Sequence, residues 1–222
     1  MAVTVFHVNI RSWKTNNYLL RCTLSQYNPD IILLNEINIT DNRVPKISGY
    51  KSSYKCSGNH SGVAIFIKNH LISYFIEFET DQILAANIKT SLGNIIISTI
   101  YSPPRYQSLP TTILNKLLNT NLPMLIIGDF NSTHPSFDNT NSTNRASVKG
   151  KQLYSLAQSR NLSYLGPSFK TYHSGNNKGK PDLIFCNQAF HIFQHLTSQG
   201  NSVGSDHIPI IFKLQTKPFK YH

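Results

Sequence analysis

The hydrophobic pattern of the chain consists of short apolar runs that are separated by turn residues and polar stretches. Runs of this length, bounded by Gly, Pro, Asn or Ser, are typical of β-strands. The pattern predicts strands at residues 3–10, 30–34, 62–68, 71–78, 83–88, 94–101, 123–128, 181–186 and 208–214. Apolar residues at helical spacing predict helices at residues 16–26, 109–118 and 148–159. Strands interspersed with a few helices indicate an α/β chain.

The organisation of the chain favours a single domain, residues 1–222. A chain of 222 residues has the usual size of one domain and can bury a core without disulfides. No internal repeat, low-complexity linker or change in composition divides it. Long loops are expected at residues 130–147 and 172–180, and such loops in a compact domain are more often functional than idle. The polar tail after Leu214 should fray or lead into a further domain.

The charge of the chain points to a polyanionic partner. Lys and Arg number 21 against 10 Asp and Glu, which gives a net charge of +11. Such an excess favours binding to nucleic acid or to an anionic membrane surface, although basic proteins are also common without either partner. Four of the ten carboxylates lie in short segments with a catalytic pattern: Glu36, Asp129, Asp182 and Asp206.

The cysteines and the N-terminus indicate the cellular compartment in which the protein acts. Cys22, Cys56 and Cys186 are odd in number, widely spaced and without a CxxC pair. We therefore expect reduced thiols in an intracellular protein and no structural zinc site. The first ten residues show no secretory signal, and no apolar run is long enough for a transmembrane helix.

The strongest chemical signal is the segment LIIGDFN at residues 125–131. An apolar strand ends at a glycine and then presents Asp129 and Asn131, two positions apart. Side chains at this spacing on an extended segment point the same way, so they can converge on a phosphate and its attacking water. The alternative is an Asx-rich turn that only closes the strand.

Weaker signals lie at the ends of other predicted strands. His207, in the segment SDHIP, is suited to exchange protons or donate to a phosphate near neutral pH. Asp182 heads an apolar strand and could fix the imidazole of His207. Glu36 follows a buried strand, where a carboxylate suits a hard cation such as magnesium, and Asn9 closes the first strand in the same manner. Taken singly, each has an ordinary structural explanation.

Taken together, the motifs resemble the endonuclease/exonuclease/phosphatase family. In chain order they read VNI, LLNE, GVAIFI, IYSPP, IIGDFNSTHP, KPDLIF and GSDHIPI, and they span nearly the whole sequence in the family's order. The resemblance implies a four-layer α/β sandwich, with two packed mixed β-sheets flanked by helices. YSPP at 101–104, and GDFNSTHP followed by Arg145 and the Gly150-x-x-Leu153 segment, look like the endonuclease domain of non-LTR retrotransposons, LINE- and jockey-like elements.

The resemblance also implies roles for individual residues. Glu36, Asn9 and Asp206 would hold Mg²⁺, or Mn²⁺ in its place. Asp129 would orient and deprotonate a water with the help of Asn131. His207, held by Asp182, would donate to the phosphate, and Tyr101 would contact the phosphate or assist the leaving group; Asn9 belongs to this catalytic group too. Contacts to double-stranded DNA would come from a loop that looks like an inserted hairpin and from neighbouring positions: Thr171, His173, Asn176, Asn177, Lys178, Lys180, Arg145 and Ser205.

The function implied is that of a DNA endonuclease that nicks one strand and leaves a 3′-hydroxyl to prime reverse transcription. A reverse transcriptase in the same polypeptide, action in the nucleus, a monomeric domain and no membrane partner are expected with it. An AP endonuclease is a rival interpretation, but the approach to Asp182 reads Gly179-Lys180-Pro181, where such enzymes often have a Trp, and the only Trp is Trp13. A phosphatase or sphingomyelinase of the same fold would share the catalytic residues, and a non-catalytic DNA-binding module would share the basic charge.

Overall fold

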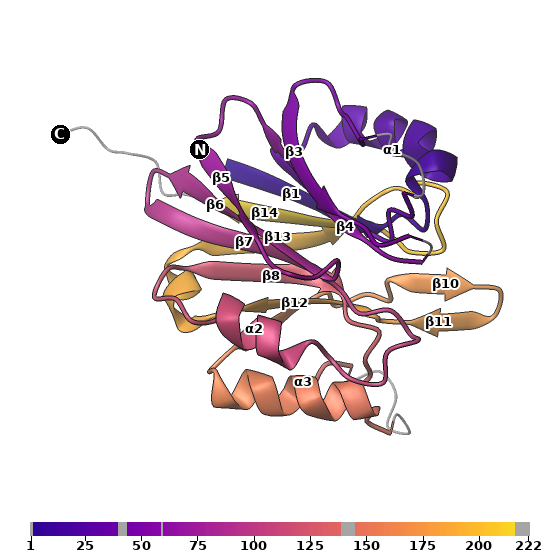
Figure 1. The fold of residues 1–222 in the computed structure, drawn as a ribbon, viewed down its shortest axis with the longest axis vertical. Coiled ribbons are helices and arrows are strands. Elements are labelled where there is room, and N and C mark those ends of the chain that lie inside the picture. The colour runs from indigo at the N-terminus through magenta and orange to yellow at the C-terminus, as the bar shows by residue number, and fades with distance from the viewer. Residues whose placement is uncertain (1, 40–43, 59, 139–144, 216–222) are drawn as a thin grey trace.

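Two six-stranded β-sheets packed face to face form the body of the protein in the computed structural model, which describes residues 2–39, 44–58, 60–138 and 145–215 (Figure 1). Sheet A has the spatial order β13 (Gln194–Gln199), β14 (Ile210–Gln215), β1 (Ala2–Asn9), β2 (Ile31–Asn35), β4 (Val63–Lys68) and β3 (Tyr50–Lys55). Sheet B has the order β5 (Ser73–Glu77), β6 (Ile83–Thr90), β7 (Gly93–Tyr101), β8 (Met124–Asp129), β12 (Asp182–Cys186) and β9 (Ser163–Gly166). Both sheets are mixed, because β1–β2 and β7–β8 are parallel pairs among antiparallel ones.

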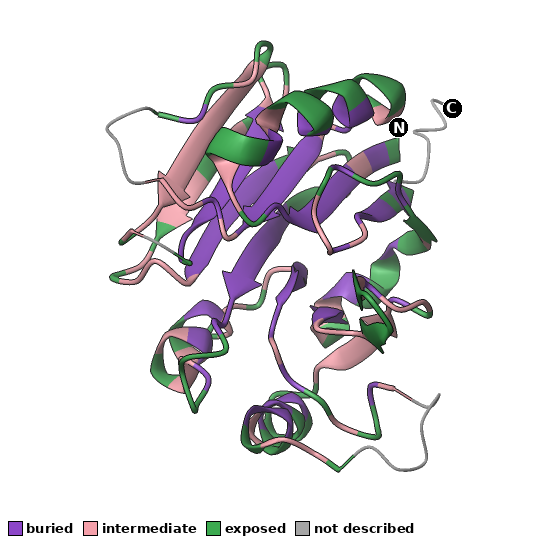
Figure 2. Ribbon diagram, turned by 90° about the vertical axis from the view of Figure 1, so that its right-hand side faces the viewer, coloured by how far each residue is buried: buried purple, intermediate pink, exposed green. Residues whose placement is uncertain are grey.

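Helices cover the outer faces of both sheets. Helix α1 (Trp13–Tyr27) lies on sheet A, whereas α2 (Thr111–Leu117) and α3 (Val148–Ser159) lie on sheet B (Figure 1). The largest apolar cluster fills the space between the sheets and includes Val5, Leu33 and Ile127, and a second joins Phe6 to Leu20 of α1. A third lies between sheet B and its helices, and Figure 2 shows the central strands as the buried part of the molecule. The predicted four-layer α/β sandwich is confirmed.

Strand β1 shows how the residue pattern sets these layers. Side chains alternate between the two faces of a strand, and Val3 and Val5 pack between the sheets while Phe6 packs toward α1. The same alternation turns His7 and Asn9 toward the space between the sheets. Two polar side chains therefore stand at the end of an otherwise apolar row.

The pairing of the strands brings the predicted site residues to one end of the sandwich. In sheet A, Asn9 pairs with Asn35 at the ends of the parallel strands β1 and β2. In sheet B, Asp129 pairs with Tyr101 on one side and with Asp182 on the other. Four predicted site residues, Asn9, Tyr101, Asp129 and Asp182, therefore lie at the ends of their strands before any side-chain contact is considered.

Two glycines allow close backbone approaches beside this edge. A Cβ atom at Gly128 would lie 2.1 Å from the carbonyl oxygen of Ile100 in β7, and one at Gly150 would lie 1.9 Å from the carbonyl oxygen of Thr133. Any other residue would force these segments apart. The glycine that precedes Asp129 therefore serves the packing of β8 against β7.

The predicted elements are present with end shifts of a few residues, and the differences have physical causes. Helix α1 begins at Trp13 rather than at residue 16, because the Oγ of Ser12 accepts a hydrogen bond from the backbone N–H of Thr15 and caps it. The sequence pattern missed β3, β9 and β13. Strands β3 and β13 are sheet edges with half-exposed or exposed side chains, so they lack the apolar run that marks a central strand.

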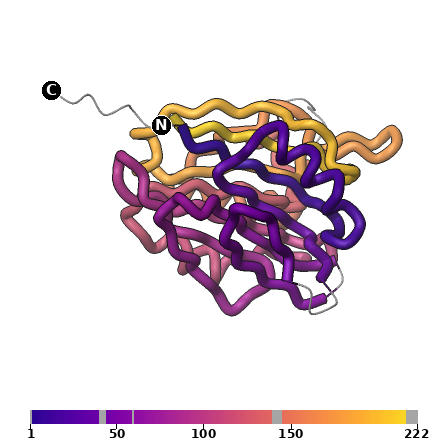
Figure 3. Tube along the Cα trace, turned by 90° about the horizontal axis from the view of Figure 1, so that it is seen from above, coloured from indigo at the N-terminus to yellow at the C-terminus, as the bar shows by residue number. Residues whose placement is uncertain are grey.

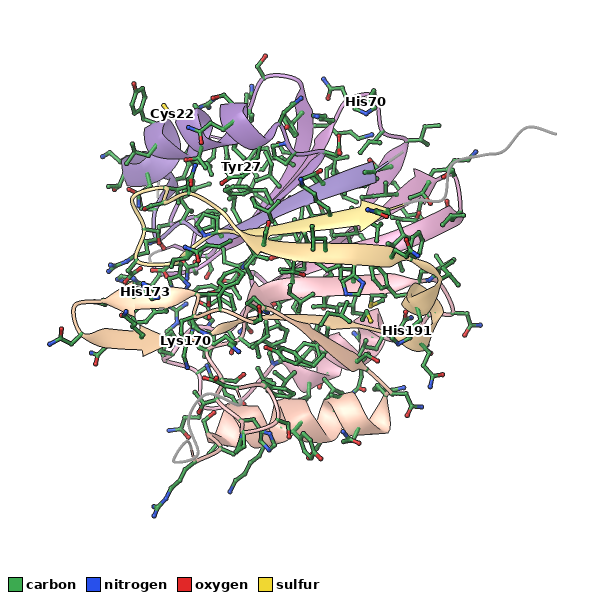
Figure 4. All side chains as sticks on the ribbon, turned by 180° about the vertical axis from the view of Figure 1, so that it is seen from behind. Cys22, Tyr27, His70, Lys170, His173 and His191 are labelled. Atoms are coloured by element: carbon green, nitrogen blue, oxygen red, sulfur yellow. The ribbon has the colours of Figure 1, made fainter. Side chains whose placement is uncertain are left out.

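A hairpin protrudes from the body within the predicted loop 172–180. It consists of β10 (Tyr172–Ser174) and β11 (Asn177–Gly179), which pair with each other and stand away from both sheets (Figure 3). His173, labelled in Figure 4, lies on this hairpin. The hairpin that the resemblance implies is therefore present, next to the end of the sandwich where the candidate residues meet.

The cysteines and the helices give two further findings. Cys22 on α1 (Figure 4), Cys56 and Cys186 are free thiols. Among the described residues, no helix has the length and apolar character needed to cross a membrane. The predicted tail beyond residue 215 lies outside the described part of the chain.

Candidate active site

A cleft of about 620 Å³ opens where the strands β1, β2, β7 and β8 end. Eight predicted site residues line it: Asn9, Glu36, Tyr101, Asp129, Asn131, Lys180, Asp206 and His207. They come from both sheets and from the loops that leave them. The cleft therefore gathers the residues that the motifs single out along the chain.

Asp129 is the buried carboxylate at the floor of this cleft. Its Oδ2 accepts a hydrogen bond from Asn9 Nδ2 at 2.9 Å, and its Oδ1 accepts one from the backbone N–H of Asn131 at 3.0 Å. Burial, followed by the negative charge of Asp182, raises the pKa of Asp129 to about 6, although His207 and these hydrogen bonds act in the opposite direction. Asp129 is therefore a stronger base than an ordinary aspartate and is still mostly ionised at neutral pH.

Asn131 lines the cleft although it does not lie on an extended segment, which is the conformation that the prediction assumed. Strand β8 ends at Asp129, and Asn131 has a left-handed backbone with φ of 44°, which Asn tolerates better than most residues. Both side chains nevertheless line the same cleft, so the predicted convergence of Asp129 and Asn131 is observed.

His207 is held by Asp182, as predicted. The Nδ1 atom of His207 lies 2.8 Å from Oδ2 of Asp182, and its Nε2 lies 3.9 Å from Oδ2 of Asp129. Burial disfavours the charged imidazole, but the charge and hydrogen bond of Asp182, with the charges of Asp129 and Asp206, outweigh it and raise the pKa of His207 to about 9. Burial would likewise favour a neutral Asp182, but its histidine partners hold the pKa of Asp182 well below the ordinary value. His207 is therefore a cationic donor at neutral pH.

Glu36 directly follows the C-terminal end of β2 and has a left-handed backbone, with φ of 51°. Its Oε2 accepts hydrogen bonds from Asn9 Nδ2 at 3.1 Å and from the hydroxyl of Tyr101 at 3.0 Å, and His60 Nδ1 lies 3.1 Å from Oε1. Burial and the charge of Glu36 raise the pKa of Tyr101 far above the usual range. The phenol therefore stays protonated and acts as a donor.

Asn9 bridges the two carboxylates rather than facing the solvent. Its amide nitrogen donates to Glu36 and Asp129, while its carbonyl oxygen accepts from the backbone N–H of Arg11 at 2.9 Å. In this arrangement the amide nitrogen of Asn9 is engaged by both carboxylates, and its carbonyl oxygen keeps one lone pair beside the bond from Arg11. It joins the candidate metal side of the cleft, Glu36, to the candidate base, Asp129.

Two sets of side chains have the chemistry of cation ligands. Asp129, Asp182 and His207 are buried, and their ligand-type atoms lie within 4.8 Å of one another. A protonated His207 cannot coordinate a cation and would repel it. Glu36 and Asp206 are carboxylates that line the cleft, with Oδ2 of Asp206 3.1 Å from Nη1 of Arg11. Carboxylate oxygens are the donor type that hard cations prefer.

The residues expected to contact DNA fall into four groups. Lys180 lines the cleft, and the exposed His173, Asn176, Asn177 and Lys178 lie on the β10–β11 hairpin. Arg145 is exposed but does not line the cleft. Thr171 and Ser205 face inward and form hydrogen bonds within the protein.

The inward-facing pair supports the catalytic residues. Thr171 is fully buried, and its hydroxyl accepts from the backbone N–H of Asp182 at 3.2 Å. Ser205 donates to the backbone carbonyl of Asn9 at 2.7 Å and accepts from the N–H of His207 at 3.1 Å. These contacts correct the expectation that Thr171 faces the DNA, because a fully buried side chain has no surface left for it.

Several supporting residues escaped the sequence analysis. Buried Asn35 accepts from the N–H of Asp129 and donates to the hydroxyl of Thr99, both at 2.9 Å. Buried Lys149 donates to the backbone carbonyls of the two residues after Tyr101, at 3.2 and 2.7 Å. A polar residue inside an apolar strand, as in LLN at 33–35, is the one signal that could have indicated Asn35.

Comparison with known proteins shows which family the chain belongs to. A family model described as "Endonuclease-reverse transcriptase" matches residues 95–211, more than half of the chain. The chain belongs to the endonuclease-reverse transcriptase family. This membership confirms the predicted superfamily and makes the chain a phosphodiester hydrolase.

Curated relatives of this family member are mobile-element proteins of flies. The chain is 24% identical over 212 residues to a probable RNA-directed DNA polymerase from transposon X-element of Drosophila melanogaster, covering 91% of this chain and 23% of the relative. It is 25% identical over 214 residues to the RNA-directed DNA polymerase from mobile element jockey of Drosophila funebris, with 90% and 22% covered. The chain thus spans less than a quarter of the length of these relatives.

Solved structures confirm the fold of the family. The endonuclease domain of TRAS1, a telomere-specific non-LTR retrotransposon, superposes with a TM-score of 0.76 at 17% identity, covering 97% of this chain and 99% of that one. The AP endonuclease LMAP from Leishmania major gives 0.74 at 14% identity, covering 97% and 88%. At these identities the likeness concerns the fold alone.

Proposed function

We propose that this domain is a magnesium-dependent DNA endonuclease that nicks one strand and leaves a 3′-hydroxyl and a 5′-phosphate. The observation that supports it most is the bridge of Asn9 between Glu36 and Asp129, with the His207–Asp182 pair against the same carboxylate. A base, a cationic donor and a hard-cation ligand thus share one cleft. Attack of water on a phosphodiester needs these three functions.

The donor set fits a magnesium ion. Glu36 and Asp206 would hold it, because both are carboxylates that line the cleft, and Mg²⁺ is usually held by one or two carboxylates, waters and phosphate oxygens. When bound, the ion would neutralise phosphate charge and acidify a water. Mn²⁺ has similar ligand preferences and would substitute.

Asp129 would act as the general base. Its raised pKa of about 6 brings it closer to neutral pH, where a base is most effective. The hydrogen bonds from Asn9 and Asn131 fix the orientation of the carboxylate, so it can align a water for in-line attack. Asn131 lines the cleft beside it and would help to place that water.

His207 and Tyr101 would stabilise the charge that develops on the phosphate. A cationic His207 can donate from Nε2 to a non-bridging oxygen while Asp182 keeps Nδ1 engaged. The protonated hydroxyl of Tyr101, anchored on Glu36, can donate to the phosphate or the leaving oxygen. Each donor is preorganised by a carboxylate, so little rearrangement is needed in the transition state.

Double-stranded DNA would bind across this cleft and along the hairpin. The net charge of +11 and the exposed Lys178 on the hairpin favour a phosphate backbone. Arg11 and Lys180 line the cleft as well, where they are paired with Asp206 and Asp138. The exposed hairpin tip, with its two asparagines and Lys178, can enter a groove and select the site. Arg145 would contact the backbone beyond the cleft.

In the cell, we infer a role in retrotransposition. The curated relatives are RNA-directed DNA polymerases about four times as long as this chain, which supports a reverse transcriptase in the same polypeptide. Residues 1–222 would then be one endonuclease domain, acting as a monomer in the nucleus. Its 3′-hydroxyl product would serve as the primer for reverse transcription.

Incubation with supercoiled plasmid tests this function. With magnesium we expect nicked circles whose 3′-ends a DNA polymerase extends directly, and no product in excess chelator. The Asp129→Asn variant should retain DNA without nicking it. Abasic duplex, an inositol phosphate and sphingomyelin serve as competing substrates, and faster hydrolysis of any of these than of intact plasmid would refute the assignment.

A further inference from the structure

A buried histidine stands behind the catalytic pair. His7, on β1, is 1% exposed, and its Nε2 atom lies 3.1 Å from Oδ1 of Asp182. The other oxygen of that carboxylate, Oδ2, lies 2.8 Å from Nδ1 of His207. The three side chains form a line from sheet A through β12 of sheet B to the cleft.

We propose that His7 is a positioning residue for the phosphodiesterase reaction, which fixes the Asp182 carboxylate so that Asp182 in turn fixes the imidazole of His207. This inference rests on the proposed function of the cleft. His7 itself does not line the cleft, so it would act only through Asp182.

The hydrogen bonds define what His7 contributes. Asp182 accepts at both oxygens, from His7 at Oδ1 and from His207 at Oδ2. A carboxylate held at one oxygen can rotate about its Cβ–Cγ bond, whereas one held at both cannot do so without breaking a bond. Since Asp182 is an acceptor, His7 donates from Nε2, which fixes its tautomer and aims Oδ2 at His207.

The cost of His7 indicates that it does more than fill space. Its Nδ1 atom is buried and has no hydrogen-bond partner among the described residues, which opposes folding. The positions that precede it on the same face of β1, Val3 and Val5, are apolar, whereas an apolar residue at position 7 would leave Oδ1 of Asp182 without its donor. A polar side chain that breaks an apolar row in order to hold a buried carboxylate is typical of a functional position.

Two variants separate positioning from packing. His7→Leu keeps an apolar bulk and removes the donor, whereas His7→Gln keeps an amide nitrogen that can take the place of Nε2. On plasmid with magnesium we expect kcat of His7→Leu to fall about 10- to 100-fold, as for other residues that orient a catalytic group. Its KM should change little, and His7→Gln should recover most of the rate. Thermal unfolding of His7→Leu should occur at a lower temperature than in the wild type, because the buried Oδ1 of Asp182 loses its donor. The rates are therefore compared at a temperature at which both variants are folded.

A second readout does not depend on activity. In ¹H–¹⁵N spectra without metal, the proton on Nδ1 of His207 should give a downfield signal, because it forms a hydrogen bond to the carboxylate of Asp182. We expect this signal to broaden or vanish in His7→Leu and to persist in His7→Gln. An unchanged signal in His7→Leu, or equal rate losses in both variants, would overturn the inference. If the wild type does not nick DNA, the proposed function fails, and the spectra still decide the role of His7.

Discussion

Asn35 offers a quantitative test of how the two sheets hold the candidate base. Its buried amide accepts from the N–H of Asp129 and donates to the hydroxyl of Thr99. In Asn35→Leu the buried N–H of Asp129 loses its acceptor, which costs about 1–3 kcal/mol, and Thr99 loses its hydrogen bond, which costs about 1 kcal/mol more. We therefore expect Asn35→Leu to lower the free energy of unfolding by about 2–4 kcal/mol.

The Thr99→Val variant completes a double-mutant cycle. Alone it leaves the amide nitrogen of Asn35 unsatisfied, at a cost of about 1–2 kcal/mol, but combined with Asn35→Leu it removes only a group that has already lost its partner. The double variant should therefore be about 1–2 kcal/mol more stable than the sum of the single effects predicts.

Urea unfolding, followed by the fluorescence of Trp13, measures these free energies. Asn94→Leu, at an exposed position of β7, the strand of Thr99, is the matched control and should change the unfolding free energy by less than about 0.5 kcal/mol. Additive effects of Asn35→Leu and Thr99→Val would refute the reasoning. Nicking by Asn35→Leu should also slow, because the backbone of Asp129 loses its anchor.

Further predictions address packing, protonation and DNA binding. Gly128→Ala should lower the melting temperature by several degrees, because its Cβ would lie 2.1 Å from a backbone oxygen; an unchanged calorimetric melt would contradict this. The nicking rate against pH should rise as Asp129 loses its proton near pH 6 and fall as His207 loses its own near pH 9; a rate still rising above pH 9 would exclude a cationic His207. Lys178→Ala should lower the slope of log affinity against log salt by about 1, whereas Lys89→Ala, at the far end of sheet B, should leave it unchanged.

The sequence predicted the structure and role of a residue well where both follow from residues adjacent to it in the chain. Strand β8 and the residues at its end could be predicted because an apolar run, a glycine and an acid stand together. The fold could be inferred because these motifs keep a family's order. Edge strands such as β3, with the sequence YKSSYK, remained hidden because neither face is fully buried.

The supporting residues of the site could not be predicted, because their partners are distant in sequence. His7 meets Asp182 across 175 positions, and Asn35 meets Asp129 across 94. A single polar residue in an apolar strand gives no indication of its role until its partner on the facing sheet is known. Thr171 shows the converse, because the resemblance implied a DNA contact and the fold buries its hydroxyl under Asp182.

The central claim is that Glu36, Asp129 and His207 act as one phosphodiesterase centre, and side-by-side nicking of supercoiled plasmid tests it most directly. Wild type with magnesium should yield nicked circles, while Glu36→Gln, Asp129→Asn and His207→Ala should each lose at least about a hundredfold in rate and still retain plasmid DNA. Nicking at the wild-type rate by any of these three variants would contradict the account.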